Sequence, residues 1–133
     1  MGFLTEKYDM DLIGIAYNAA LNATHGHGPA IDMKDAIRLV YQCNHTANAD
    51  DGSVVWTVEE SADTTDGNFA ALEASTFTCT HTSAEVATWK TIEVPAQAMT
   101  TGKRYLRLTA TTAAAHNAGI IAVAVRQNVF ANV

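Results

Sequence analysis

The stretch Val54-Val-Trp-Thr-Val-Glu-Glu-Ser61 alternates apolar and polar side chains around Trp56. Alternation with a period of two is typical of a β-strand that has one face in the core and the other in water. Two turn signals bound this stretch: Asp51-Gly52 is a strong turn pair, and the segment from Asp63 to Asn68 is rich in Asp, Thr, Gly and Asn. We therefore predict a strand here, with a turn at each end.

The period of two recurs along the chain, with breakers between the stretches. The further strands that we predict cover residues 37–43, 77–80, 86–94, 103–112 and 120–129. No crossover helix pattern separates them, so a parallel sheet is disfavoured. Short strands with frequent turns predict an all-β fold, an antiparallel β-sandwich or jelly roll. The expected core residues are Leu39, Val54 or Val55, Trp56, Leu106, Leu108, Ile121 and Val123, and Trp89 is also expected to pack inward.

The first thirty residues differ from the rest. Apolar residues recur there at helical spacing, but Gly14 and two asparagines weaken a helix, so a helical and an extended form both stay open. His25–Pro29 is a clear breaker. We predict an N-terminal arm at residues 1–30 and a sandwich domain at 31–133. An arm this apolar must rest on its own domain or on a neighbour, and we favour a neighbouring subunit. The interface residues expected on it are Leu4, Leu12, Ile13, Tyr17 and Leu21.

Composition and charge narrow the class of protein. The chain has 133 residues, 48% hydrophobic and 17% charged, which fits one folded domain. The net charge is −6; residues 44–85 carry acids without Lys or Arg, whereas after Glu93 only bases follow. This separation is either chance or a pair of complementary faces between subunits, which would place Lys103, Arg104 and Arg107 at an interface. Nucleic-acid binding is disfavoured by the acidic half.

The expected compartment follows from what the sequence lacks. No leader pattern is visible at the start, and no stretch approaches the roughly 18 apolar residues of a membrane span. We therefore expect assembly in a cytoplasm and no membrane partner. Cys43 and Cys79 are expected to be reduced and buried, with a disulfide between them as the less favoured alternative.

Motifs for catalysis or for a cofactor are hard to find. The histidines are scattered over separate loops, apart from His25 and His27, whereas a zinc site needs three or four ligands. No nucleophile motif or phosphate-binding glycine loop occurs. Glu59 and Glu60 are adjacent, so on a strand they point to opposite faces and are poor acid–base partners. We predict no enzyme activity, no catalytic residue, no metal site and no cofactor.

One order of motifs resembles a known family. An Asp-Gly turn precedes the strand that ends in Glu60-Ser61, an acidic turn and the apolar stub Phe69-Ala-Ala-Leu72 follow, and Lys103-Arg-Tyr-Leu-Arg-Leu108 leads to the final apolar strand Ile120–Val125. This order is similar to that of the small jelly-roll capsid cement, or decoration, proteins of tailed phages. The similarity covers residues 31–125 and leaves out the first thirty.

The resemblance implies a structural role. A cement protein binds the outside of the phage capsid and stabilises contacts between major capsid protein subunits. It implies small homo-oligomers, among which we favour a trimer over a dimer, and a location on the virion. The rival hypothesis is a carbohydrate- or receptor-binding sandwich module of a phage tail or fibre, resting on Trp56, Trp89 and Tyr105.

Overall fold

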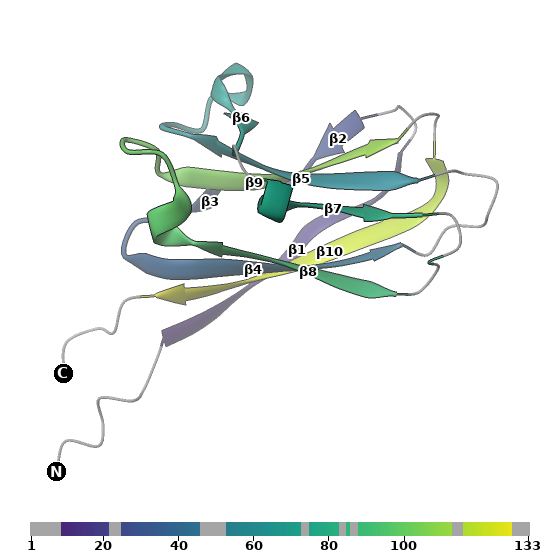
Figure 1. The fold of residues 1–133 in the computed structure, drawn as a ribbon, viewed down its shortest axis with the longest axis horizontal. Coiled ribbons are helices and arrows are strands. Elements are labelled where there is room, and N and C mark those ends of the chain that lie inside the picture. Colours follow the sequence, from purple (N-terminus) through teal and green to yellow (C-terminus); the bar gives the residue numbers. More distant parts are fainter. Residues whose placement is uncertain are drawn as a thin grey trace, which may run out of the picture.

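The computed structural model describes residues 9–21, 25–45, 53–72, 75–82, 85, 88–112 and 116–128. The chain folds into two antiparallel sheets packed face to face, which confirms the expected all-β sandwich (Figure 1). The first sheet has the strand order β1-β10-β4-β8. Its strands are β1 (Asp9–Leu21), β10 (His116–Asn128), β4 (Ala36–His45) and β8 (Trp89–Pro95).

The second sheet has the order β2-β9-β5-β6, and two short strands extend its edges. β3 pairs with β9 beside β2, and β7 pairs with β5 beside β6. These strands are β2 (His25–His27), β3 (Ile31–Asp32), β5 (Val54–Ser61), β6 (Ala70–Ala71), β7 (Thr78–His81) and β9 (Tyr105–Thr112). The described helices are single 3₁₀ turns, η3 (Asp66–Asn68), η4 (Ser75–Phe77) and η5 (Ala96–Ala98), and none is long and apolar enough to cross a membrane.

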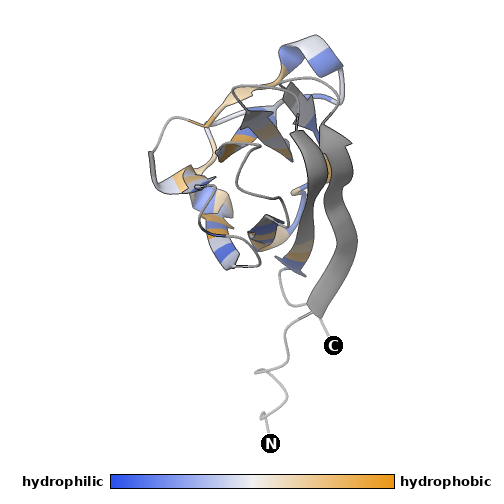
Figure 2. Cartoon of the chain, turned by 90° about the vertical axis from the view of Figure 1, so that its right-hand side faces the viewer, coloured by the Kyte–Doolittle hydropathy of each residue, from blue (hydrophilic) through white to orange (hydrophobic). Residues whose placement is uncertain are grey.

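Alternation along β5 places its apolar residues in the core. Trp56 is fully buried, and Val54 and Val58 are buried on the same face, whereas Val55 is half-buried on the other. Figure 2 looks at the sandwich from the side and shows apolar and polar residues alternating along the strands that it colours by hydropathy. The buried core residues shared between the sheets include Leu39, Tyr41, Cys43, Ile92, Val94, Leu106 and Leu108.

Most of the expected core is confirmed, and one residue is wrong. Leu39, Val54, Trp56, Leu106 and Leu108 are buried as predicted. Ile121 and Val123 have their backbone in β10, and their side chains lie outside the described part. Trp89, expected in the core, has 52% of its surface exposed. It points away from the core because Ile92 and Val94 face inward and Trp89 has the opposite parity.

Two segments within the predicted arm, residues 9–21 and 25–27, form strands that pair with the two sheets. β1 is extended and pairs along β10, from Asp9 opposite Asn128 to Leu21 opposite His116, with register shifts. β2 pairs with β9 in the other sheet. The physical reason is that β10 has a second edge whose backbone groups need partners, and β1 supplies them. Leu4 lies outside the described residues.

Candidate interaction surface

A pocket is lined by the segment that leads from β8 through η5 into β9 and by the turn after β3. Figure 1 shows that this segment lies at one end of the sandwich. Its volume is about 400 Å³. Three segments line it: the turn after β3, η5 with Met99, and the turn from Thr100 to Arg104. The apolar part of the wall comes from Met33, Ala96 and Met99. Methionine adapts its shape to different partners, which suits a docking pocket.

The charged residues that line this pocket are all positive, although the chain as a whole is acidic. Its lining holds Lys34, Lys103 and Arg104 and no carboxylate. Lys34 and Lys103 are exposed. In a chain of net charge −6, such a rim selects an acidic or carboxylate-bearing group. We call these three cations and the pocket between them the basic pocket.

Backbone hydrogen bonds explain why the basic pocket keeps its shape. Gly102 has a φ of 90°, which a residue with a side chain rarely adopts, and Lys103 N donates to Thr100 O at 3.0 Å to close the turn. Thr100 N donates to Oε2 of the buried Glu60 at 2.9 Å. The turn is therefore tied to β5 through a buried carboxylate.

Arg104 is held in place by Asp32. Arg104 Nε and Nη2 donate to the two carboxylate oxygens of Asp32 at 2.8 and 2.6 Å. The bond from Arg104 lowers the pKa of Asp32 to about 2, against burial, which acts in the other direction. In the β3–β9 pair, Asp32 lies opposite Tyr105. This register brings the side chain of Asp32 to that of Arg104, the residue before Tyr105. Arg104 is thus fixed in place and paired with a carboxylate, so the exposed positive charge of the rim comes from Lys34 and Lys103.

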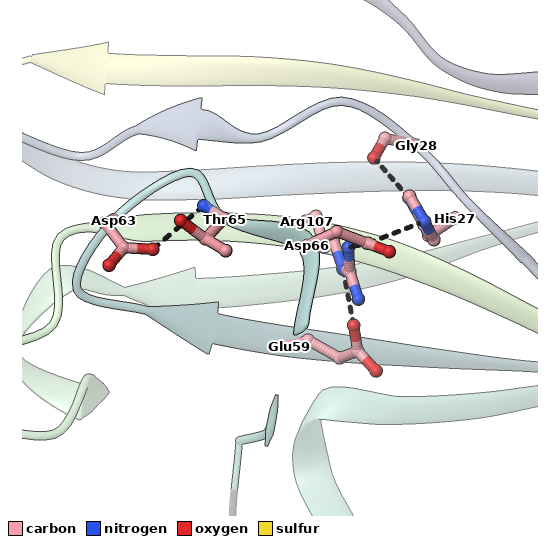
Figure 3. Close-up of polar contacts among 7 residues, drawn as sticks. All are labelled: His27, Gly28, Glu59, Asp63, Thr65, Asp66 and Arg107. Carbon is pink, nitrogen blue, oxygen red and sulfur yellow. Dashed lines mark hydrogen bonds and ion pairs between the residues drawn. The ribbon is translucent and has the colours of Figure 1, made fainter. Parts of the chain in front are cut away.

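Arg107, the third cation expected at an interface, instead forms ion pairs with carboxylates of its own chain (Figure 3). It is 7% exposed, and its Nε donates to Glu59 Oε2 at 2.5 Å while its Nη1 pairs with Asp66. Its guanidinium carbon lies 4.3 Å from the centre of the Phe69 ring. Although burial acts to lower the pKa of Arg107, its bonds to Asp66 and Glu59 raise it. We call Arg107, Glu59, Asp66 and Phe69 the Arg107 cluster.

The Arg107 cluster fastens the turn after β5 onto the outer face of the second sheet. His27 Nε2 reaches Asp66 Oδ1 at 3.0 Å, so β2 joins the same group (Figure 3). Inside the turn, Asp63 accepts hydrogen bonds from Thr65 N and from Asn68. These bonds lower the pKa of Asp63. The acidic turn is therefore an ordered part of the sheet surface.

Trp89 marks a second exposed place, on the outer face of the first sheet. It begins the edge strand β8 and lies opposite Asn44 of β4. Asn44 is 8% exposed, and its Oδ1 has no hydrogen-bond partner among the residues that the structure describes. Next to them Thr91 donates to Gln42 Oε1 at 2.8 Å. An exposed indole ring beside amide and hydroxyl groups can stack on a flat apolar surface and offer hydrogen bonds at its edge.

The described residues gather few groups for chemistry. No three His, Cys, Asp or Glu side chains among them lie close enough to hold a metal ion. Glu59 and Glu60 do point to opposite faces, as predicted: Glu59 joins the Arg107 cluster and Glu60 is buried under the basic pocket. His81 is buried, and it is hydrogen-bonded to Trp56 and to a backbone carbonyl.

The structure brings together only part of the expected interface. Lys103 and Arg104 share the basic pocket, whereas Arg107 belongs to its own cluster. The backbone of Leu12, Ile13, Tyr17 and Leu21 lies in β1, and their side chains are outside the described part, so their interface role stays a prediction. The sequence did not predict that Lys34, Met33 and Met99 line a pocket. In the sequence, Lys34 is marked only by the small number of lysines. Its position near Lys103 could not be predicted, because the β3–β9 pairing of the folded chain brings the two together.

Three solved structures resemble this fold. PBSX exported protein XepA has a TM-score of 0.58 at 16% identity, covering 94% of this chain and 39% of its own. A pilus protein of Bacillus endospore appendages, described as disulfide-linked, has a TM-score of 0.56 at 15% identity, covering 93% and 90%. The K1 cleaved adhesin domain of Lys-gingipain from Porphyromonas gingivalis W83 has a TM-score of 0.49 at 20% identity, covering 80% and 63%.

The likenesses to XepA and to the endospore pilus protein show the β-sandwich fold. The chain spans less than half the length of XepA and less than two thirds of the adhesin domain. No protein-family model matches the chain, and no curated protein matches it.

Proposed function

We propose that this chain is a structural virion protein that binds the outside of a tailed-phage capsid and stabilises contacts between major capsid protein subunits. The observation that carries the proposal is the basic pocket: three cations and two methionines at one end of a stiff sandwich, in a chain of net charge −6. A surface of this kind suits an acidic loop of a protein partner. The order of strand and turn motifs, similar to that of cement proteins, supports the phage setting, and so does the likeness of the fold to XepA.

Physical reasons favour such a role for a protein of this build. DNA packed into a phage head pushes the shell outward, and a clamp across a subunit junction adds contacts that must break before the shell opens. Many copies on a lattice add avidity, so each pocket needs only modest affinity. We propose that the protein joins the virion during assembly in the host cytoplasm and self-associates, with a trimer favoured over a dimer. Light scattering at two concentrations measures the oligomer directly.

Cosedimentation with shells tests the capsid role. Shells assembled from the major capsid protein of the same genome are mixed with the purified chain, and the bound fraction is measured against salt concentration. The paired substitution Lys34→Gln and Lys103→Gln removes two positive charges from the pocket and is expected to weaken binding at least tenfold. The control, Ser53→Glu with Thr76→Glu, changes the net charge equally at two exposed residues and should bind normally.

Two outcomes would count against the proposal. A wild-type chain that stays in the supernatant would remove the capsid role. If the pocket variant and the control lost binding equally, the loss would be an effect of net charge. The pocket would then have no specific role in binding.

A second candidate function is a carbohydrate- or receptor-binding module, and one observation favours it: Trp89 is exposed on an outer face, opposite Asn44. Trp56 no longer contributes, because it is fully buried. This candidate predicts binding on a glycan array that Trp89→Ala abolishes and that the pocket variant keeps. The two functions therefore separate by which variant loses binding.

A further inference from the structure

Two cysteines meet inside the sandwich although they come from different sheets. Cys43 lies on β4 and is fully buried, and Cys79 lies on β7 and is half-buried against the same core. Both are free thiols. Both side chains pack into the same hydrophobic core.

The strand pairings independently place the two residues together. Cys43 is opposite Lys90 in the β4–β8 pair. Lys90 Nζ in turn donates to the carbonyl oxygen of Thr80, the residue after Cys79, at 2.5 Å. Cys79 is opposite Trp56 in the β5–β7 pair, so it has the inward parity of the buried tryptophan. Register and hydrogen bonding thus aim both thiols at the space between the sheets.

We propose that Cys43 and Cys79 are a modification site: they form an intramolecular disulfide that joins the two sheets when a small-molecule disulfide such as oxidised glutathione is present. A disulfide needs β-carbons that face each other at short range, and two cysteines that point from facing sheets into the same core meet the first part of this requirement. The remaining closing movement falls on β7, a four-residue strand that among the described strands pairs only with β5. The inference does not depend on the proposed capsid role.

The geometry also sets the order of the two steps. Cys79 is the more accessible thiol, and the hydrogen bond from Cys43 lowers its pKa, with a smaller contribution from Lys90. The same bond and burial raise the pKa of Cys43. The Cys79 thiolate therefore attacks one sulfur of oxidised glutathione, forms a mixed disulfide and releases one glutathione thiolate.

Cys43 then completes the exchange. It loses its proton, attacks the Cys79 sulfur and displaces the second glutathione. The protein is oxidised by two electrons and one glutathione disulfide is reduced to two glutathione molecules, so atoms and electrons balance. A reducing cytoplasm keeps the site open, and an oxidising medium closes it.

The test uses the full chain with reduced or oxidised glutathione, followed by thiol counting in denaturant and peptide mapping. We expect two free thiols before oxidation and none afterwards, a monomeric product and a crosslinked peptide that contains Cys43 and Cys79. Because the bond closes a long loop, the melting temperature should rise by about 10 °C. Thiols that stay free, or disulfide-linked dimers, would overturn the inference.

Two single variants test the order of the steps. Cys43→Ala should accumulate the glutathione adduct on Cys79, whereas Cys79→Ser should leave Cys43 unmodified. Neither should show the rise in melting temperature. The reverse pattern of adducts would contradict the assignment of Cys79 as the attacking thiol. If Cys43→Ala fails to fold, Cys79→Ser and the wild-type peptide map still decide the matter.

Discussion

The two tryptophans occupy opposite environments although both stand in alternating stretches of sequence. Trp56 lies in β5, between β9 and β7, and is fully buried, with its Nε1 donating to His81 Nδ1 at 2.9 Å. Trp89 begins the edge strand β8 and is 52% exposed. The difference teaches that alternation tells which residues share a face, while the position of a strand in its sheet decides whether that face is covered. The predictions below contrast the covered interior with the outer faces.

The largest effect is expected at Trp56. Trp56→Ala should lower the free energy of unfolding by about 3–5 kcal/mol, because it removes a fully buried ring and leaves a cavity. Chemical denaturation monitored by far-UV circular dichroism measures this. Trp56→Phe is the matched control; it keeps most of the ring and loses the bond to His81, so its cost should be smaller. A cost under 1 kcal/mol for the alanine variant would contradict the covered interior.

The second largest loss of stability is expected on substitution in the Arg107 cluster, because this cluster lies on an outer face and is nevertheless buried. Arg107→Ala should cost about 2–3 kcal/mol, since it leaves the carboxylate of Glu59 without its cation and Phe69 without its stacked guanidinium. Arg107→Lys keeps the charge but loses the two-pronged geometry, and an intermediate cost is expected. Denaturant melts of both variants test this order, and equal stability of all three proteins would show that the cluster is incidental.

A smaller effect is expected from the titration of His81. His81 accepts a bond from Trp56 at Nδ1 and so donates from Nε2 to the Thr88 carbonyl at 2.7 Å, which requires the neutral ring. Burial is the main cause that lowers its pKa. The stabilisation that neutral His81 provides is therefore complete above its ordinary pKa of 6.5 and is lost as the pH falls through its lowered pKa in the folded state. Unfolding curves from pH 7.5 to 5 measure the slope, and His81→Gln should flatten it.

The exposed pair of Asp32 and Arg104 should contribute less. Its stabilisation is present above the ordinary Asp pKa of 3.8 and is lost as the pH falls toward 2, because the pKa in the folded state is lowered to about 2. At pH 7 the variant Asp32→Asn should cost about 0.5–1 kcal/mol, since solvent screens the pair. The difference from the wild type should vanish near pH 2. A difference that persisted there would have to come from something other than the charge.

The smallest effect on stability is expected at Trp89. Trp89→Ala should change the free energy of unfolding by no more than about 0.5 kcal/mol, because the side chain is half in water and lies outside the core. Comparing this value with that of Trp56→Ala under the same conditions gives the sharpest measure of the contrast between the two tryptophans. A cost above 2 kcal/mol would mean that Trp89 packs against something that buries it.

Parts of the fold followed directly from local pattern. The strand at Val54–Ser61 and the opposite directions of Glu59 and Glu60 were predictable because side chains alternate along any extended chain. The β1 strand was not, since helical spacing and strand formation compete in a segment with Gly14, and the open edge of β10 settled the competition. The basic pocket was equally hidden, because Lys34 and Lys103 are far apart in sequence and meet only through the β3–β9 pairing.

The sequence by itself determined an all-β sandwich, its principal core residues and a separation of acidic and basic halves, since these depend on composition and on a period of two. Only the tertiary structure decided which cations are free for a partner: Arg107 is neutralised by Glu59 and Asp66, whereas Lys34 and Lys103 remain exposed beside a pocket. It also decided that Cys43 and Cys79, from different sheets, pack into the same core. Contacts between residues distant in the chain depend on strand order and register, and no local pattern encodes either of these.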